Sequence, residues 1–415
     1  MSELALFGGE RIRKKPFAAG ACIGDEERQR VSQVLEEGVL SGFIAKKGDY
    51  FLGGKQVREF EGLVKDYFPC KHAVSVNSAT AGLHVALGAC GIGPGDEVIV
   101  PPYTMSATAT AVLMQGAIPV FADIEEERCC LDPQKIEERV TSRTRAIIVV
   151  HLFGYPAKMD DIMVVAKRHG LKVVEDCAQA PGTEFKGKRV GTFGDAGVFS
   201  LNQHKTVTSG EGGFVITGDD RLALRMQLMR NHGEVIVDDF GIPEHYDIVG
   251  YNYRMTELEA AVATGQFRRL DSLTRHRIDL AEYLMKKLSG FKGLMLPKAD
   301  GNKHVYFVFP MRFLEKEAGM SREDFVRALV AEGIPVAAGY VKPIYLASYY
   351  QKGFVKGQPV RDFYGKGICP VCERMHEKEF LCTGVCRHPH TKEDMDDVVA
   401  AVGKVFANRH EFKTS

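Results

Sequence analysis

The chain has 415 residues, with 54 lysines and arginines balanced by 54 aspartates and glutamates. This balance excludes a strong overall field that would attract nucleic acid or an anionic membrane, so we expect small polar substrates. A chain of this length exceeds the size at which a single hydrophobic core keeps growing, and we expect two domains. Ten scattered cysteines, with no secretory signal and no long apolar run, favour a reducing cytoplasm.

The first 60 residues are mixed in composition and are expected to lead into the first domain. They carry a helical pattern at 25–38 and the start of a second amphipathic stretch at 57–68. From residue 71 onward, short β-branched runs alternate with helical segments such as 79–90 and 159–169. The expected strands are 73–76, 97–101, 119–122, 145–151, 171–175, 196–201 and 213–217. This alternation predicts a mostly parallel sheet with helices on both faces.

The C-terminal part of the chain again mixes helices and strands. A long charged helical pattern runs from Thr256 to about Leu288 and is expected to connect the two domains, with a solvated charged face at 268–277. A strand is expected at 305–310, and helices at 322–332 and 392–406. We therefore predict an N-terminal lead-in at 1–60, a large domain at 61–270 and a small C-terminal domain at 271–415.

One lysine, Lys205, follows the apolar run 196–201 and precedes a Ser-Gly-Glu-Gly-Gly turn. A strand in this place would expose the lysine at the edge of the sheet, where ligands of such sheets bind. An amine whose pKa is lowered by desolvation can form a Schiff base with an aldehyde. A solvated loop lysine is the ordinary alternative, and other residues of the chain decide against it.

Two further segments add polar groups at the ends of expected strands. Residues 77–82 follow a strand and open a helix, so that hydroxyl and N–H groups point out of a positive helix end, although Ser78 could equally act as an ordinary N-cap. Such a helix end can bind an anion, and Ser200, on a neighbouring strand, could reach the same anion. Asp176 ends another strand and could either hold a ring nitrogen protonated or simply cap the next helix. Gln179, one helical turn later, would lie on the same face as Asp176. A Schiff-base lysine, an anion cradle and a ring-nitrogen partner are what pyridoxal phosphate requires.

These residues occur within motifs that resemble the DegT-type sugar aminotransferases of the pyridoxal-phosphate (PLP) fold type I, over nearly the whole chain. The motifs are residues 93–99, 174–180, 200–213 and 250–255. The resemblance implies an aspartate-aminotransferase-like α/β fold, with a mostly parallel seven-stranded sheet in the large domain and a smaller C-terminal α/β domain.

The resemblance also implies roles for individual residues. Lys205 is the Schiff-base lysine, Asp176 partners the pyridinium nitrogen, and Gln179 lies near the phenolic oxygen of PLP. Asn252 reaches the phosphate from a second subunit, which implies a homodimer with shared active sites. The implied phosphate contacts are Ser78, Ala79, Thr80 and Ser200.

The chain departs from the family pattern where an aromatic residue usually stacks on the pyridine ring. Met105 occupies this position, and a methionine sulfur can contact an aromatic face. Tyr103, two residues earlier, is the alternative.

A group of cysteines and histidines near the C-terminus has almost the spacing of a structural zinc site. The group comprises Cys369, Cys372, Cys382, Cys386, His388 and His390. Because residues 369–374 resemble a family segment that needs no metal, we predict no metal site.

The resemblance favours an aminotransferase that moves an amino group from glutamate or glutamine to a keto sugar or keto-cyclitol. Residues 4–10 look like the branch that acts on keto-inositols and related rings. A PLP-dependent sugar dehydratase or deoxygenase is an alternative, but such relatives replace the lysine with histidine, and here histidine is only the neighbour, His204. A PLP-binding regulator without turnover is the third hypothesis.

Overall fold

A computed structural model describes residues 3–20, 22–245, 247–298, 300–352, 354–355, 358–359 and 364–413. Its helices are α1 (Asp25–Glu37), α2 (Lys55–Tyr67), α3 (Ala79–Ala89), α4 (Ala107–Met114), α5 (Pro133–Arg139), α6 (Met159–His169), α7 (Asp220–Arg230), α8 (Gly233–Phe240), α9 (Glu257–Arg268), α10 (Leu270–Leu288), α11 (Glu315–Ala318), α12 (Arg322–Ala331), α13 (Pro370–Arg374) and α14 (Lys392–Ala407). Its strands are β1 (His72–Val76), β2 (Glu97–Val100), β3 (Ile118–Phe121), β4 (Thr144–Val150), β5 (Lys172–Asp176), β6 (Glu184–Phe185), β7 (Lys188–Arg189), β8 (Ala196–Ser200), β9 (Gly213–Thr217), β10 (Leu294–Met295), β11 (Phe309–Phe313), β12 (Ala337–Ala338), β13 (Phe354–Val355), β14 (Gln358–Pro359) and β15 (Phe380–Thr383).

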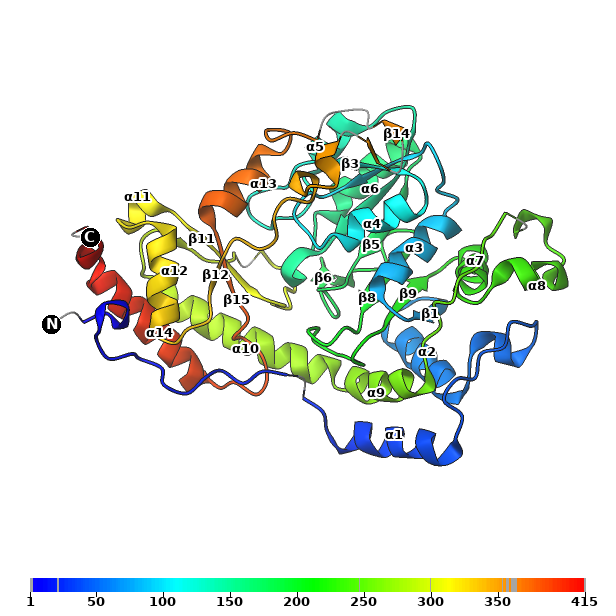
Figure 1. Ribbon diagram of the computed structural model, residues 1–415, viewed down its shortest axis with the longest axis horizontal. Coiled ribbons are helices and arrows are strands. Elements are labelled where there is room, and N and C mark those ends of the chain that lie inside the picture. Colours follow the sequence, from blue (N-terminus) through cyan, green and yellow to red (C-terminus); the bar gives the residue numbers. More distant parts are fainter. Residues whose placement is uncertain are drawn as a thin grey trace.

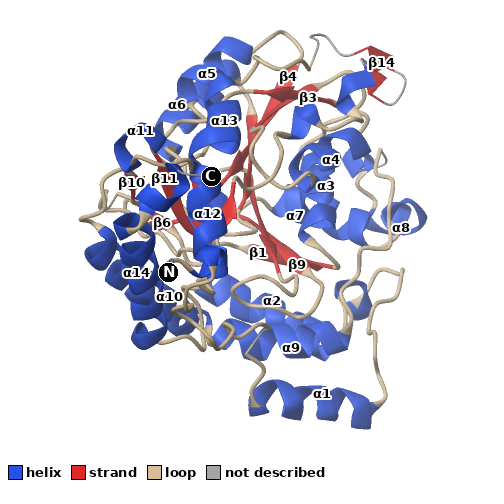
Figure 2. Cartoon of the chain, turned by 60° about the vertical axis from the view of Figure 1, so that its left-hand side comes forward, coloured by secondary structure: helices blue, strands red, loops and turns tan. Residues whose placement is uncertain are grey.

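Seven strands form the large sheet in the order β1-β9-β8-β5-β4-β2-β3. Only β9 runs antiparallel to its neighbours, and the other four strand pairs are parallel. Figure 2 shows α3, α4 and α7 on one side of this sheet and α5 and α6 on the other. All seven expected strands are present within one residue at each end, which confirms the mostly parallel seven-stranded α/β fold.

Alternating side chains of the central strands pack against different helices. Val198 and Val215 belong to the core that contains α3, whereas Phe199 and Phe214 stack with ring centroids 4.7 Å apart in the core formed with α2 and α9. Since successive side chains of a strand point to opposite faces, strands buried on both faces read as continuous apolar runs. This pattern made the sheet visible in the sequence.

A second, four-stranded sheet has the order β10-β11-β15-β12, and all its pairs are antiparallel. It packs with α10, α12 and α14 around a separate core, and α10 runs from this core toward the large sheet (Figure 1). Residues from the same half of the chain also return to the large core, including Tyr345 and Cys372. The boundaries 1–60, 61–270 and 271–415 stay a prediction.

Three expectations about the C-terminal half were wrong in detail. The helical pattern after Thr256 is two helices, because the backbone of Arg269 (φ −97°, ψ 2°) breaks it. The strand expected at 305–310 begins only at Phe309, since Tyr306 has φ 48° and the N–H groups of 305 and 307 donate to the loop after β4. The face at 268–277 is not wholly solvated, because Arg277 is buried.

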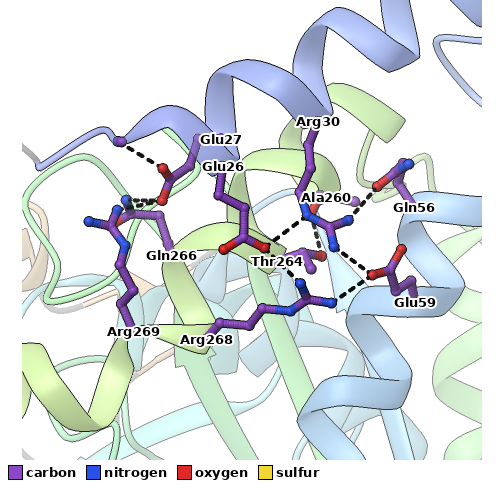
Figure 3. Close-up of polar contacts among 11 residues, drawn as sticks. Glu26, Glu27, Arg30, Gln56, Glu59, Ala260, Thr264, Gln266, Arg268 and Arg269 are labelled. Atoms are coloured by element: carbon purple, nitrogen blue, oxygen red, sulfur yellow. Dashed lines mark hydrogen bonds and ion pairs between the residues drawn. The ribbon is translucent and has the colours of Figure 1, made fainter.

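Helix α1 packs on α9, and ion pairs join it to α2 and α9 (Figure 3). Arg30 pairs with Glu26 at 3.2 Å and with Glu59 at 2.8 Å. Arg268 pairs with the same two carboxylates at 2.8 and 3.1 Å. The network joins the consecutive helices α1 and α2 to α9, which lies far from them in the sequence. Among the described residues, no helix has the length and hydropathy required to cross a membrane.

Candidate active site

Lys205 lies in the segment between β8 and β9, where its backbone N–H donates to the carbonyl of Asn202 at 2.9 Å. Its Nζ lies 4.9 Å from the centroid of the Phe307 ring, which comes from the segment before β11. Burial lowers the pKa of the Lys205 amine, and the negative charge of Asp176 opposes this shift. The amine therefore has the desolvated environment that the nucleophilic hypothesis requires.

Asp176 is the last residue of β5, the strand next to β8, and is only 5% exposed. Its carboxylate accepts hydrogen bonds from Thr108 Oγ1 at 2.9 Å and from the N–H of Ala178 at 3.1 Å. Burial raises the pKa of Asp176, while these hydrogen bonds and the Lys205 charge act in the opposite direction. The bond from Ala178 also means that Asp176 does organise the turn after its strand.

Gln179 is buried beside Asp176, and both ends of its amide are bonded. Its Oε1 accepts from the N–H of Phe153 at 2.7 Å, and its Nε2 donates to the hydroxyl of Tyr340 at 2.8 Å. These contacts fix the orientation of the side chain, which leaves one amide N–H to face a ligand.

The expected anion cradle lies where the start of α3 approaches the start of β9. Ser78 caps α3 by accepting a hydrogen bond from the N–H of Ala81 at 3.1 Å, so the N-cap interpretation is correct, while its own O–H remains able to donate. Ser200, 8% exposed, pairs with Gly213 across the sheet. A Cβ on Gly213 would lie 2.8 Å from the backbone nitrogen of Ala79, so only glycine permits this close approach.

Thr80, in the first turn of α3, is half-buried, whereas the last two expected cofactor contacts are exposed. Met105, just before α4, is 57% exposed, and Asn252 is exposed beside Asn77, whose Nδ2 donates to the Asn252 carbonyl at 3.5 Å. Asn252 is thus close to the cradle of its own chain, and its role toward a second subunit stays a prediction. Tyr103 is fully buried and its hydroxyl accepts from the N–H of Tyr340 at 2.8 Å, so it supports the core behind the site.

The cysteines and histidines near the C-terminus do not gather into one ligand set among the described residues. Cys372 packs in the large core and Cys386 in the small one. The described residues bring only His151, Glu175 and Cys177 within metal-ligand distance of each other. In this trio the His151 ring already accepts from the N–H of Ala157 and donates to Glu175 at 3.0 Å, so neither ring nitrogen offers a lone pair.

Four residues of this neighbourhood were not identified in the sequence: Thr108, Phe153, Phe307 and Tyr340. Each reaches Lys205, Asp176 or Gln179 through a contact between distant segments, such as the 161 residues that separate Gln179 from Tyr340. No local pattern marks them, because an isolated threonine or aromatic residue is ordinary in a core.

The seven-stranded sheet, with a lysine after β8 and an aspartate at the end of β5, has the fold of the PLP-dependent transferases of fold type I. The model of the DegT/DnrJ/EryC1/StrS aminotransferase family matches residues 22–403, and the chain belongs to this family and is an aminotransferase. This confirms the resemblance and the enzyme class.

Two curated relatives and one solved structure illustrate the similarity. L-glutamine:2-deoxy-scyllo-inosose aminotransferase of Streptomyces kanamyceticus is 38% identical over 349 residues, which cover 82% of this chain and 81% of the relative. GDP-perosamine synthase of Caulobacter vibrioides is 40% identical over 283 residues, 68% of this chain and 75% of the relative. An aminotransferase from Psychrobacter cryohalolentis superimposes with a TM-score of 0.83 at 30% identity and covers 95% of this chain and 100% of its own.

Proposed function

We propose that this enzyme uses PLP to transfer an amino group from glutamine or glutamate to the keto group of a sugar or cyclitol. The names of the relatives support both halves of this proposal. One relative is named for L-glutamine and a keto-cyclitol, and another for an amino sugar attached to a nucleotide. The site observation that carries the proposal is the desolvated Lys205 amine beside the buried Asp176 carboxylate.

The residues present fit PLP. A buried carboxylate with a raised pKa lacks a full counter-charge, and a protonated ring nitrogen would supply one to Asp176. The open helix end at Ser78, Ala79 and Thr80 offers N–H and O–H donors to a phosphate, and Ser200 lies across from Gly213 at the same place. When bound, PLP supplies an electron sink for the carbanion formed at the substrate carbon.

Each residue then has a defined task. Lys205 Nζ would hold the cofactor covalently, and its free amine would move the substrate proton as general base and acid. Asp176 keeps the ring nitrogen charged, and Thr108 holds the Asp176 carboxylate in place. The amide of Gln179, fixed by Phe153 and Tyr340, would donate its free N–H to the phenolic oxygen of the cofactor. Met105 is proposed to contact the face of the ring.

A donor screen tests the function directly. The PLP-loaded protein is mixed with single amino acids, and the pyridoxal absorbance is followed; glutamine or glutamate should convert it, and the product form should then aminate a keto-cyclitol or keto sugar detected by mass spectrometry. A protein that no amino acid converts would be a regulator without turnover. Loss of oxygen from the sugar without gain of nitrogen would indicate the dehydratase or deoxygenase reaction.

A homodimer with shared sites is part of the proposal. Apolar side chains lie exposed near Asn252, where the 44–50 segment meets α8: Ile44 is 53% exposed, Tyr50 58%, Val235 69% and Val249 62%. The carbonyl of Ile44 accepts from Asn231, which pairs with Asn252, so these residues are close to one another. Exposed apolar groups gathered in one region are typical of an interface.

The small polar substrates and the ten unpaired cysteines, all among the described residues, also support a cytoplasmic location, because cysteines generally stay reduced in that compartment.

A further inference from the structure

A small cavity with a cationic wall lies beside Lys205. It has a volume of about 40 Å³, and its lining comes from Gly20 and Cys22, the Lys205 segment, α9, α10 and the loop after β15. Its polar lining includes His204, Lys205, Thr206, Arg277, Arg387 and His388. Among the described residues that line this cavity, here called the Arg277 cavity, none is acidic.

Arg277 is the most deeply placed of these cations, with 7% of its surface exposed. Its hydrogen bonds within the described residues, to the carbonyls of Tyr306 and Phe307 at 3.3 and 3.2 Å, both leave from Nη1. Burial, and next the charge of Arg387, lower the pKa of Arg277 to about 10. A buried guanidinium without a carboxylate partner is costly, and a ligand anion would remove the cost.

Unsatisfied donors on the same wall also point to a ligand. The Thr206 hydroxyl, on a residue that is 8% exposed, and Arg387 Nε are both buried with no hydrogen-bond partner in the part of the chain described. Buried polar atoms of this kind normally have a partner, so two on residues that line one cavity are unusual. His388 also lines the cavity, and burial and then the charge of His276 lower its pKa, which favours the neutral ring.

Cys22 forms one side of the cavity, here called its roof, and hydrogen bonds hold it in place. The carbonyl of Cys22 accepts hydrogen bonds from Gln266 Nε2 at 2.8 Å and from Arg269 Nη2 at 2.7 Å. Both donors also bond to Glu27, as Figure 3 shows, and Glu27 in turn accepts from the N–H of Gly24 at 2.8 Å. Glu27 therefore holds the roof in place, and its charge is engaged with Arg269 and not with the cavity.

We propose that the Arg277 cavity binds the α-carboxylate of the amino-acid donor, an inference that rests on the proposed function. A group the size of a water molecule needs about 10–15 Å³ of cavity volume, so this cavity holds about three such groups. This number matches the three heavy atoms of a carboxylate, and the cavity is too small for a nucleoside diphosphate. The donor's amine lies one carbon from its carboxylate. Because Lys205 lines the same cavity, a donor anchored there has its amine next to the reactive lysine.

The test uses glutaramate, the glutamine skeleton without its amine, which can bind but cannot react. Its dissociation constant for the PLP-loaded protein is measured by calorimetry for the parent, Arg387→Met, Arg277→Lys and Arg275→Met. Loss of a charge-assisted hydrogen bond should weaken binding by about 10- to 100-fold in Arg387→Met. Arg275 is exposed on α10, two residues from Arg277 and outside the cavity lining, so Arg275→Met is the matched control and should bind as the parent does.

A kinetic arm separates carboxylate recognition from general damage. The half-reaction with glutamine should slow in Arg387→Met, whereas 4-aminobutanamide, which lacks the α-carboxylate, should react equally in parent and variant. Equal glutaramate affinity in the parent and in both cavity variants would overturn the proposal, as would a cavity that binds inorganic sulfate but not glutaramate. If no amino acid reacts at all, the proposed function fails, while glutaramate binding still decides whether the cavity recognises a carboxylate.

Discussion

At the residue scale, burial acts in opposite directions on the two central ionisable groups. It lowers the pKa of Lys205 and raises the pKa of Asp176, because desolvation disfavours both the ammonium and the carboxylate. Each charge partly offsets the shift of the other. Without the cofactor, both groups are therefore held at a cost in stability, and this cost is the price of a site shaped for a cationic ring and a neutral amine.

Asp176→Asn should stabilise the cofactor-free protein at neutral pH while it removes most of the transamination rate. The folded-state pKa of Asp176 is raised above its ordinary value of 3.8, so its favourable contribution is complete at low pH and is lost as the pH rises from about 3.8 through the folded-state pKa. Urea unfolding of both cofactor-free proteins between pH 4 and 8 measures the difference, which should grow with pH. Near-normal turnover in the variant would reduce Asp176 to a turn residue.

Lys205→Ala should bind PLP, remain coloured and be almost inactive. The proposed contacts at Ser78, Thr80, Ser200 and Asp176 do not require the lysine, but the proton transfer does, and groups of this kind contribute about 10²- to 10⁴-fold. Borohydride should no longer fix the cofactor to the chain. Peptide mapping of the reduced parent provides the check: a pyridoxyl group on any other lysine would show that the site is assigned wrongly.

At the element scale, the strands of the large sheet could be predicted because each is buried on both faces and short. The run at 196–201 is apolar throughout, and polar residues begin directly after it, so the strand and the position of Lys205 were visible together. The strand expected at 305–310 was equally apolar but was wrong. There the chain instead bonds to the loop after β4 and turns at Tyr306, a long-range interaction that no local pattern encodes.

Prediction of the candidate site likewise succeeded for residues within motifs and failed for residues that act through long-range contacts. Residues within motifs, such as Asp176 and Gln179, were identified because strand ends place them at one edge of the sheet. Their partners Thr108 and Tyr340 were missed, since their importance depends only on where α4 and the segment after β12 pack. The burial of Arg277 was missed for the same reason, because a charged residue on a charged helix predicts solvent exposure.

The attachment of α1 offers a test at this scale. Glu27 is 1% exposed and bonds to Gly24, Gln266 and Arg269 (Figure 3), so Glu27→Ala should lower the free energy of unfolding by about 1–3 kcal/mol. Urea denaturation measures this loss. Glu36→Ala, an exposed position on the same helix, should change stability by less than about 0.5 kcal/mol. Equal effects of the two substitutions would contradict the role of Glu27 in attaching α1.

At the scale of the whole molecule, the N-terminal segment connects the two sheets. It begins against the small core, where the N–H of Ala5 donates to Glu332 at 2.9 Å, and both chain ends lie at this side of the molecule (Figure 1). It then passes Cys22, the roof of the Arg277 cavity, and ends in α1 on the large domain. The same segment therefore contacts the small core through Ala5 and lines the Arg277 cavity through Cys22.

The proposed sharing of sites between subunits can be tested with mixed dimers. If Asn252 holds the phosphate of the partner subunit, Asn252→Ala should weaken cofactor retention, and Lys205→Ala should be inactive on its own. A dimer with one subunit of each variant would then contain one site with both an intact Lys205 and an intact Asn252 from the other chain. Unfolding and refolding an equal mixture should give half mixed dimers and restore about a quarter of the parent activity, since one site in every four is intact.

Contact within one chain predicts a different result. Asn252 lies beside Asn77 of its own chain, next to the cradle, so a phosphate contact in the same subunit would leave every site of the mixed dimer with one defect. Activity would then stay at the level of the two variants measured apart. Mixing parent with Lys205→Ala provides the control for recovery after refolding, because it should give activity in proportion to the parent under either arrangement. Restored activity in the first mixture and proportional activity in the control together require that the two residues act across the interface.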